Sequence, residues 1–370
     1  MPDRGRPPAP SSSPASPPAG TASTRSPPLD GLRAVAIAAV ILFHIKHKLA
    51  PGGFVGVDLF FVISGFVITR SLASELRRTG AISIRAFYLR RVRRILPALL
   101  VFMAGTAALS LAAGRGSGSE GKAALAVATS SLNWFLAFGG YETLRTSWFV
   151  HAWSLSVEEQ FYILWPLAFV LLSRRNSPSI TLAALAAGIA LSAALAFFLA
   201  AQGAPWSRVY FGFDARAQGL LAGCLLAVAG TAAVPAPVRK LWPVAALAFL
   251  AMTLTVDNHG PFLGLGGFTL AALVSAWLIA AAAEDGEAPL ARLLSARPLV
   301  WVGLRSYSLF LWHYPIAQAL YSGGLRYWPS LTLVLSLIVA DLSYRFVERP
   351  FLKRRSGELP SAAAEEQAAP

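Results

Sequence analysis

The sequence predicts an all-α fold: a polytopic transmembrane helix bundle with about ten crossings and one re-entrant or interfacial segment. Hydrophobic residues make up 55% of the 370 residues and charged residues only 14%, which is too apolar for an ordinary soluble domain. The apolar residues are gathered into long runs, and most Lys and Arg residues lie between those runs. These features together are typical of a membrane protein.

The apolar runs give the expected helices in order. A helix that crosses the hydrocarbon core needs about 20 residues, and lipid offers no other partner for its backbone polar groups. Eleven segments approach that length: residues 31–47, 54–70, 95–113, 122–138, 153–172, 179–201, 214–231, 240–256, 262–283, 299–320 and 330–347.

The basic residues indicate the orientation of these segments, because Lys and Arg stay on the cytoplasmic side of a membrane. Residues 70–94 contain eight arginines and one acid, Glu75, so this loop is expected inside. The N-terminal tail and the segment YRFVERPFLKRR are also basic. Both termini are therefore expected in the cytoplasm, and the number of crossings is expected to be even. The net charge of +14 is explained by these loops, and no nucleic-acid partner is expected.

Segment 122–138 is the weakest of the eleven. It is short and includes Ser130, Ser131 and Asn133, and polar backbone of this kind at membrane depth belongs in a re-entrant or interfacial segment. Leaving it out gives ten crossings and places Arg174, Arg175, Arg239 and Lys240 inside.

The two ends of the chain have a different composition. Residues 1–28 contain nine prolines and no apolar core of the kind that a signal peptide needs. We expect disordered cytoplasmic tails at 1–28 and 356–370 and a single transmembrane domain at 29–355. Cys224, the only cysteine, lies in an apolar run and is expected to serve packing.

Ionisable residues within the runs are the first candidates for function, because a charge in a span costs about 2.5–3.5 kcal/mol and needs a partner. For each one, a hydrogen-bonded structural role competes with a functional role. The candidates are His44, Asp58, Glu158, Glu159, Asp214, Arg216, His313 and Asp341.

His44 follows ten consecutive apolar residues after Arg33, which places it roughly 16 Å farther along the first helix. An imidazole is well suited to remove a proton from a hydroxyl, and a carboxylate beside it would orient the ring. Asp58 begins the second helix and is the expected partner. The alternative is that Asp58 only caps that helix.

The arginines of the segment IRAFYLRRVRRILP have two interpretations. They are positive-inside residues that meet lipid headgroups, or they bind phosphates through their planar guanidinium groups. Arg85, Arg90, Arg93 and Arg94 lie near Arg33 in the expected topology. A phosphate-bearing acyl carrier bound there could extend toward His44.

Several motifs in a fixed order are shared with a known family. They are LDGLRAVAIAAVILFH, GGFVGVDLFFVISGFVIT, FYLRRVRRILPA, HAWSLSVEEQFYILWP, SYSLFLWHYPI and FVERPF. Over residues 29–355 the chain resembles the acyltransferase 3 family of integral membrane O-acyltransferases.

The resemblance implies ten transmembrane helices and transfer of an acyl group, usually acetyl from acetyl-CoA, to a hydroxyl of a carbohydrate or related acceptor. It implies that Arg33 and His44 form the family's Arg and His pair and that RRVRR is its basic third-helix motif. The element from Ser154 to Glu158 is a further hallmark. Two features differ from this pattern. Many members carry a fused C-terminal hydrolase-like domain that is not expected here, which suggests that transfer ends within the membrane domain. In addition, Gln218 stands where relatives often have an acid.

These considerations give one expected site and one expected setting. The partners are acyl-CoA, a hydroxylated acceptor and membrane lipids, with no metal, and the location is a bacterial plasma membrane. The expected catalytic residues are His44, Asp58 and Glu158, the donor-binding residues are Arg33, Arg85, Arg90, Arg93 and Arg94, and the acceptor-binding residues are Ser154, Trp153, Arg216 and His313.

Two other functions remain open from the sequence. The protein could acylate a small molecule such as a macrolide, or it could be a transporter in which His44, Asp58 and Glu158 relay protons. The outer aromatic residues are equally ambiguous, because Trp148, Trp153, Trp206 and Tyr210 suit both sugar stacking and an interfacial belt.

Overall fold

The computed structural model describes residues 26–175, 177–283 and 288–353. Throughout these three ranges the chain forms helices and turns and no strand, which confirms the predicted all-α class. The predicted tails at 1–28 and 356–370 fall almost wholly outside the described residues.

Within the described residues, eight helical stretches are long and apolar enough to cross a membrane. They are Pro27–Ile45, Val55–Thr79, Ile84–Ala112, Val150–Ser173, Pro178–Ala201, Trp206–Ala229, Leu263–Ala282 and Trp328–Leu352. Each corresponds to a segment expected from the sequence. A shorter apolar helix, Trp242–Thr255, occupies another.

The individual elements have the following bounds. The longer helices are α1 (Pro27–Ile45), α2 (Val55–Thr79), α3 (Ile84–Ala112), α4 (Ser117–Ala128), α7 (Trp153–Ser173), α8 (Pro178–Ala201), α10 (Phe213–Ala229), α12 (Trp242–Thr255), α13 (Phe268–Ala282), α16 (Ser306–Ser322) and α17 (Trp328–Ser343). The short elements are α5 (Leu132–Phe135), η1 (Leu136–Gly140), α6 (Tyr141–Leu144), η2 (Val150–Ala152), α9 (Trp206–Phe211), η3 (Thr231–Ala233), α11 (Ala236–Lys240), η4 (Leu263–Gly267), α14 (Pro289–Leu294), α15 (Arg297–Leu304), η5 (Tyr344–Glu348) and α18 (Arg349–Lys353).

Several boundaries differ from the expected segments, and α3, for example, begins at Ile84 rather than at residue 95. Segment 299–320 is not one helix but two, α15 and α16, which meet at Arg305. The Arg305 guanidinium is buried there and pairs with Asp341 of α17 at 2.6 Å. Helix α2 continues past residue 70 to Thr79 and ends where Gly80 adopts a φ of 74°, a left-handed conformation that glycine adopts readily.

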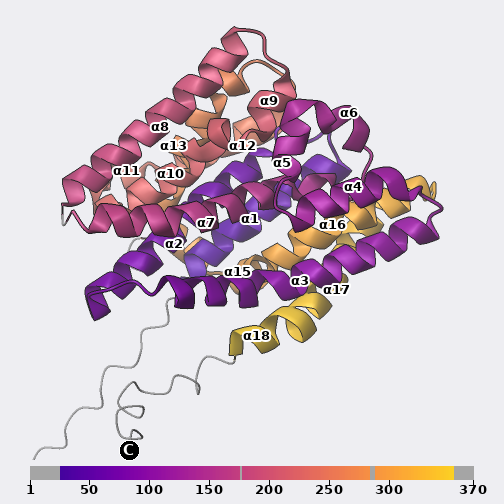
Figure 1. Ribbon diagram of the computed structural model, residues 1–370, viewed down its shortest axis with the longest axis horizontal. Helices are drawn as coiled ribbons and strands as arrows, with labels where there is room; N and C mark the ends of the chain where they lie inside the picture. The colour runs from indigo at the N-terminus through magenta and orange to yellow at the C-terminus, as the bar shows by residue number, and fades with distance from the viewer. Residues whose placement is uncertain (1–25, 176, 284–287, 354–370) are drawn as a thin grey trace, which may run out of the picture.

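Helices α1 and α2 lie in the middle of the bundle (Figure 1). Helices α8, α10, α12 and α13 pack on one side of them, and α3, α16 and α17 on the other. The central pair therefore has protein on both sides.

Glycines allow α2 and α10 to pack very closely. A Cβ added to Gly65 would lie 1.9 Å from the carbonyl oxygen of Leu220, and one added to Gly223 would lie 2.0 Å from that of Val62. Because lipid tails are as apolar as side chains, small residues that bring backbones together are what stabilise such contacts in membranes. The contact fixes the register of α10 against α2.

The segment expected to be re-entrant or interfacial is broken into short pieces. Residues 122–138 include the end of α4, a turn and α5. At the turn Ser130 has a φ of 52°, an uncommon value for a residue other than glycine. Its hydroxyl donates to Glu159, and its carbonyl oxygen accepts a 2.7 Å hydrogen bond from the Gln160 side chain. The turn is thereby attached to α7 rather than continuing as a helix.

Candidate active site

A cavity of about 870 Å³, open mouth included, lies between α1, α2, α3, α7 and α16. Its lining has many ionisable groups for a membrane bundle. The polar lining residues are Arg33, Ser64, Arg91, Arg94, Ser154, Glu158, Glu159, Tyr162, Ser306 and Tyr307. Three guanidinium groups and two carboxyl groups therefore face one space.

Only two of the five arginines expected to bind the donor line this cavity. They are Arg33 and Arg94, and Arg91, which was not in the expected set, joins them. Side chains three or four residues apart share a helix face, and positions 91, 94 and 95 lie on the face of α3 that looks into the bundle.

The other three arginines lie elsewhere on α3. Arg90 pairs with Glu75 near the end of α2 at 2.9 Å. Arg85 and Arg93 are exposed and are not among the cavity residues.

Glu158 is held in the cavity by two hydroxyl donors. Ser64 donates to its carboxylate at 2.9 Å and Tyr162, one helical turn along α7, donates at 2.7 Å. The Arg91 guanidinium lies 4.8 Å from the centre of the Tyr162 ring. The carboxylate is thus fixed in position and lies close to positive charge. Ser154, one turn before Glu158, is buried and also lines the cavity.

His44 lies in the last turn of α1 and contacts a second histidine. Its Nδ1 is 3.0 Å from the carbonyl oxygen of Val40 and 3.1 Å from Nε2 of His313. His313 is fully buried on α16. His151 follows, with its ring centre 5.4 Å from that of His313, and Tyr314 contacts all three imidazoles. No group of metal ligands is found among the described residues.

Phe310 lies between the cavity and these histidines. It lines the cavity, and its ring centre is 5.8 Å from that of His313 and 5.4 Å from that of His151. His44 itself is not one of the lining residues. Phe310 therefore borders the cavity on one side and contacts His313 and His151 on another.

The expected pairing of Asp58 with His44 is not formed. Asp58 is buried, and its Oδ1 instead lies 3.0 Å from Nη2 of Arg216 on α10. Asp58 precedes Gly65 by seven residues and Arg216 precedes Gly223 by seven, which is about two helical turns in each case. The two charges thus lie on the faces where α2 and α10 meet, and this packing turns Asp58 away from α1.

Arg216 is 1% exposed and is enclosed by aromatic rings. The ring centres of Phe61, Trp153, Tyr210 and Phe268 lie between 3.8 and 5.6 Å from its guanidinium carbon. Trp153 therefore packs on Arg216 and does not line the cavity. Contacts with ring faces stabilise a desolvated cation, so Asp58, Arg216 and Trp153 form one buried unit.

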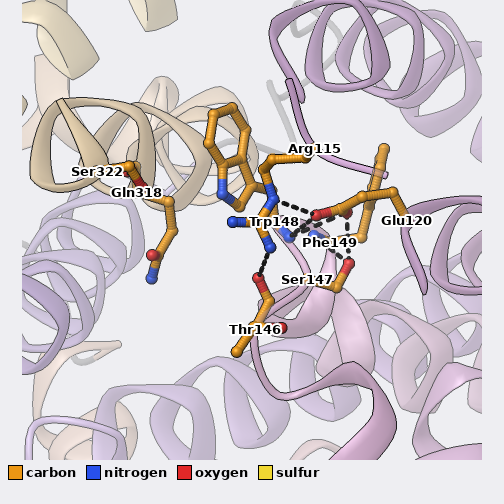
Figure 2. A network of polar contacts seen from close by, with 8 residues as sticks. All are labelled: Arg115, Glu120, Thr146, Ser147, Trp148, Phe149, Gln318 and Ser322. Carbon is orange, nitrogen blue, oxygen red and sulfur yellow. Dashed lines mark hydrogen bonds and ion pairs between the residues drawn. The ribbon is translucent and has the colours of Figure 1, made fainter. Parts of the chain in front are cut away.

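A polar network holds the segment that carries His151. Figure 2 shows Glu120 of α4 bound to Arg115 at 3.0 Å, to the hydroxyl of Ser147 at 2.7 Å and to the backbone N–H of Trp148 at 3.2 Å. Arg115 also donates to the carbonyl oxygen of Thr146 at 2.7 Å. Trp148 is fully buried and cannot stack on a sugar from outside. The network fixes the start of α7 and, with it, the position of His151.

Glu120→Gln is expected to loosen this segment. The amide puts N–H donors where the carboxylate accepts from three groups, and losing charge-assisted bonds of this kind costs about 1.5–3 kcal/mol. Amide hydrogen exchange across residues 146–152 should accelerate. Glu142→Gln is the control, because the Glu142 side chain is 78% exposed in its pair with Arg145 and such pairs contribute little. Equal protection in both variants would contradict this role for Glu120.

Gln218, which was expected to differ from relatives, is hydrogen-bonded at both ends of its amide inside the protein. Its Oε1 accepts from Thr269 at 2.6 Å and its Nε2 donates to the carbonyl oxygen of Ala215 at 2.9 Å. A second cavity, lined by Trp206, Tyr210, Asn258 and His259 among others, shares no lining residue with the first.

Comparison with known protein families gives a match over most of the chain. The family described as an acyltransferase domain matches residues 28–342, which is most of the chain. The chain belongs to the acyltransferase 3 family. Arg33, His44 and the Ser154 to Glu158 element all lie within the matched residues of this acyltransferase 3 domain.

Curated proteins with similar sequences are named as O-acetyltransferases. The chain is 34% identical over 354 residues to the peptidoglycan O-acetyltransferase OatA of Listeria monocytogenes, covering 88% of this chain and 56% of that protein. It is 35% identical over 350 residues to the putative peptidoglycan O-acetyltransferase YrhL of Bacillus subtilis, covering 88% and 54%. The chain thus spans little more than half the length of these relatives. No solved structure matches it.

Several residues of the site were missed from the sequence. Arg91 shares a helix face with buried apolar residues of α3, and Tyr162 lies one turn after Glu158, so both had a periodic signal. Ser64 and Tyr307 had none, because only the packing of α2 and α16 brings them to the cavity.

Proposed function

We propose that this protein is an integral membrane O-acetyltransferase that moves an acetyl group from acetyl-CoA to a hydroxyl of a carbohydrate, such as a cell-surface polysaccharide or glycolipid. The observation that carries the proposal is the cavity lined by Arg33, Arg91 and Arg94 and bordered by Phe310, which lies against His313, the hydrogen-bond partner of His44. The names of the relatives support the acetyl group and the carbohydrate acceptor.

The donor enters the cavity with its phosphates on the arginines. Guanidinium groups bind phosphate oxygens through paired, charge-assisted hydrogen bonds, and Arg94 lies at the exposed part of the lining. Glu158 and Ser154 of α7 line the same cavity and would form hydrogen bonds with the amide groups of the pantetheine arm of acetyl-CoA. The thioester then lies toward Phe310, and rotation of that ring joins it to the histidines.

The chain crosses the membrane ten times, with both termini in the cytoplasm. The eight long apolar stretches provide eight of these crossings, and α12 and α16 provide the other two. Contact of Gly303 with Asp30 and of His313 with His44 means that α15, α16 and α1 run in the same direction, as the first and ninth crossings must. The arginine-lined opening then faces the cytoplasm, where acyl-CoA is made, and the membrane is the bacterial plasma membrane.

In the transfer step, Nε2 of His44 takes the proton of the acceptor hydroxyl while its oxygen attacks the thioester carbonyl carbon. A C–O bond forms and the C–S bond breaks. The proton on His44 then passes to the sulfur of the departing CoA. Asp58 takes no part in this step, and with Arg216 it joins α2 to α10.

Arg94→Ala is expected to raise the KM for acetyl-CoA by about 10- to 100-fold, the loss of about 1.5–3 kcal/mol for hydrogen bonds to a charged group. The purified full chain in lipid nanodiscs would be given isotope-labelled acetyl-CoA and a glycan acceptor, and labelled ester would be measured. Arg174→Ala is the matched control, because Arg174 is exposed at the end of α7 and does not line the cavity.

Three outcomes separate the alternatives. An unchanged KM in Arg94→Ala would contradict donor binding in this cavity. Ester formed on a macrolide but on no glycan would favour a small-molecule acceptor. Proton-coupled uptake without any turnover of acetyl-CoA would replace the proposal with a transporter.

A further inference from the structure

The contact between His44 and His313 determines where the protons of both rings are. Nδ1 of His313 is 2.9 Å from the carbonyl oxygen of Leu309. A carbonyl oxygen only accepts hydrogen bonds, so this Nδ1 carries a proton. In a neutral imidazole the other nitrogen is then an acceptor, and Nε2 of His313 presents a lone pair to His44.

The same reasoning applies to His44. Its Nδ1 faces the carbonyl oxygen of Val40 at 3.0 Å and the acceptor Nε2 of His313 at 3.1 Å. Both partners accept, so Nδ1 of His44 is the donor to them. The remaining nitrogen, Nε2, carries the lone pair, and the described residues provide no hydrogen bond to it. His44 is half-buried, whereas His313 is fully buried.

This arrangement resembles the way a catalytic histidine is held by a third residue. A general base must present an unprotonated nitrogen, and a partner at the opposite nitrogen fixes the tautomer and the ring orientation. No carboxylate among the described residues bonds to either ring. The rings in contact with His44 are Phe43 on its own helix and His313 and Tyr314 on α16. His47, in the turn after α1, contacts Phe43.

We propose that His313 is the positioning residue of the reaction: through its neutral Nε2 it holds the Nδ1 proton of His44, so that Nε2 of His44 is the base. This inference rests on the proposed function and assigns His313 a role other than acceptor binding. When His44 gains the hydroxyl proton, both of its nitrogens carry protons, and the hydrogen bond from Nδ1 to His313 becomes charge-assisted and stronger. The interaction is therefore stronger after proton transfer than before it, as an interaction that speeds the step must be.

Two amide substitutions at one position test this. His313→Gln puts a side-chain oxygen near the place of Nε2 and keeps an acceptor for His44. His313→Asn puts its amide near the place of Nδ1, so it retains the bond to Leu309 but removes the side-chain acceptor and leaves Nδ1 of His44 with the carbonyl oxygen of Val40 alone. Both are polar and similar in size, and thermal unfolding in nanodiscs checks that both variants fold.

His313→Asn is expected to lower kcat by about 100-fold, within the range for loss of general-base function, with the KM for acetyl-CoA within about twofold. His313→Gln should keep kcat within about fivefold of the wild type. In the double variant with His44→Ala, His313→Asn should add no further loss, because the two act as a unit.

Equal kcat in folded His313→Gln and His313→Asn would overturn the positioning role, as would a loss that appears only in KM. Failure of the proposed function would look different. In that case the wild-type protein would not transfer acetyl groups, or His44→Ala would remain active.

Discussion

His44→Ala is expected to lower kcat for acetyl transfer by about 10³-fold, within the 10²- to 10⁴-fold range that a general base contributes. The loss should appear in kcat and not in the KM for acetyl-CoA, because His44 lies outside the arginine-lined cavity. The measurement is steady-state transfer of labelled acetyl groups by the purified protein in nanodiscs.

The matched control for His44 is His47→Ala. His47 lies three residues farther along the chain, in the turn that follows α1, is exposed, and contacts the same Phe43 ring at 5.1 Å. It therefore tests for a general effect of losing an imidazole at this end of α1. Comparable losses in both variants, or a His44→Ala protein with normal kcat, would remove His44 from the reaction.

Arg216→Met is expected to lower the free energy of unfolding by about 3–5 kcal/mol, the cost of leaving one charge of a buried pair uncompensated. The remaining Asp58 carboxylate is buried and has the Arg216 guanidinium as its ion-pair partner. Unfolding in nanodiscs or mild detergent would be followed by tryptophan fluorescence, since Trp153 lies against the guanidinium.

Two further variants make this result specific. Replacing both charges, as Asp58→Leu with Arg216→Met, should recover most of the loss, because a well-packed apolar pair avoids the desolvation penalty. Arg208→Met removes an arginine from the pair with Asp214, whose carboxylate is 33% exposed, and should cost no more than about 1 kcal/mol. A double variant less stable than Arg216→Met would contradict a mainly electrostatic origin.

The helices were largely predictable, and the reason is physical. A bilayer demands long apolar helices, so the runs of apolar residues locate α1, α2, α8, α13 and α17 directly. Segment 122–138 was also recognised as different, because Ser130 and its neighbours are polar. The break at Arg305 was not predicted, since it depends on Asp341 of α17, which is distant in the sequence.

The site was predictable only in its parts. His44, Glu158, Arg33 and Arg94 stand out as ionisable residues in or beside apolar runs, and three of these line one cavity. Their partners depend on which helices pack together. Asp58 was expected beside His44 because α1 and α2 are neighbours in the chain. The close packing of α2 on α10 at glycines instead places Asp58 beside Arg216.

The ring of Phe310 has a consequence for how an acetyltransferase of this design treats its donor. Under the proposed function, the thioester of acetyl-CoA bound in the cavity would meet the Phe310 side chain before it reached His313 and His151, so turning of that ring would open its way to the imidazoles. Hydrolysis of the thioester in the absence of an acceptor would then be limited by a change in the side-chain rotamer of Phe310, without movement of a helix.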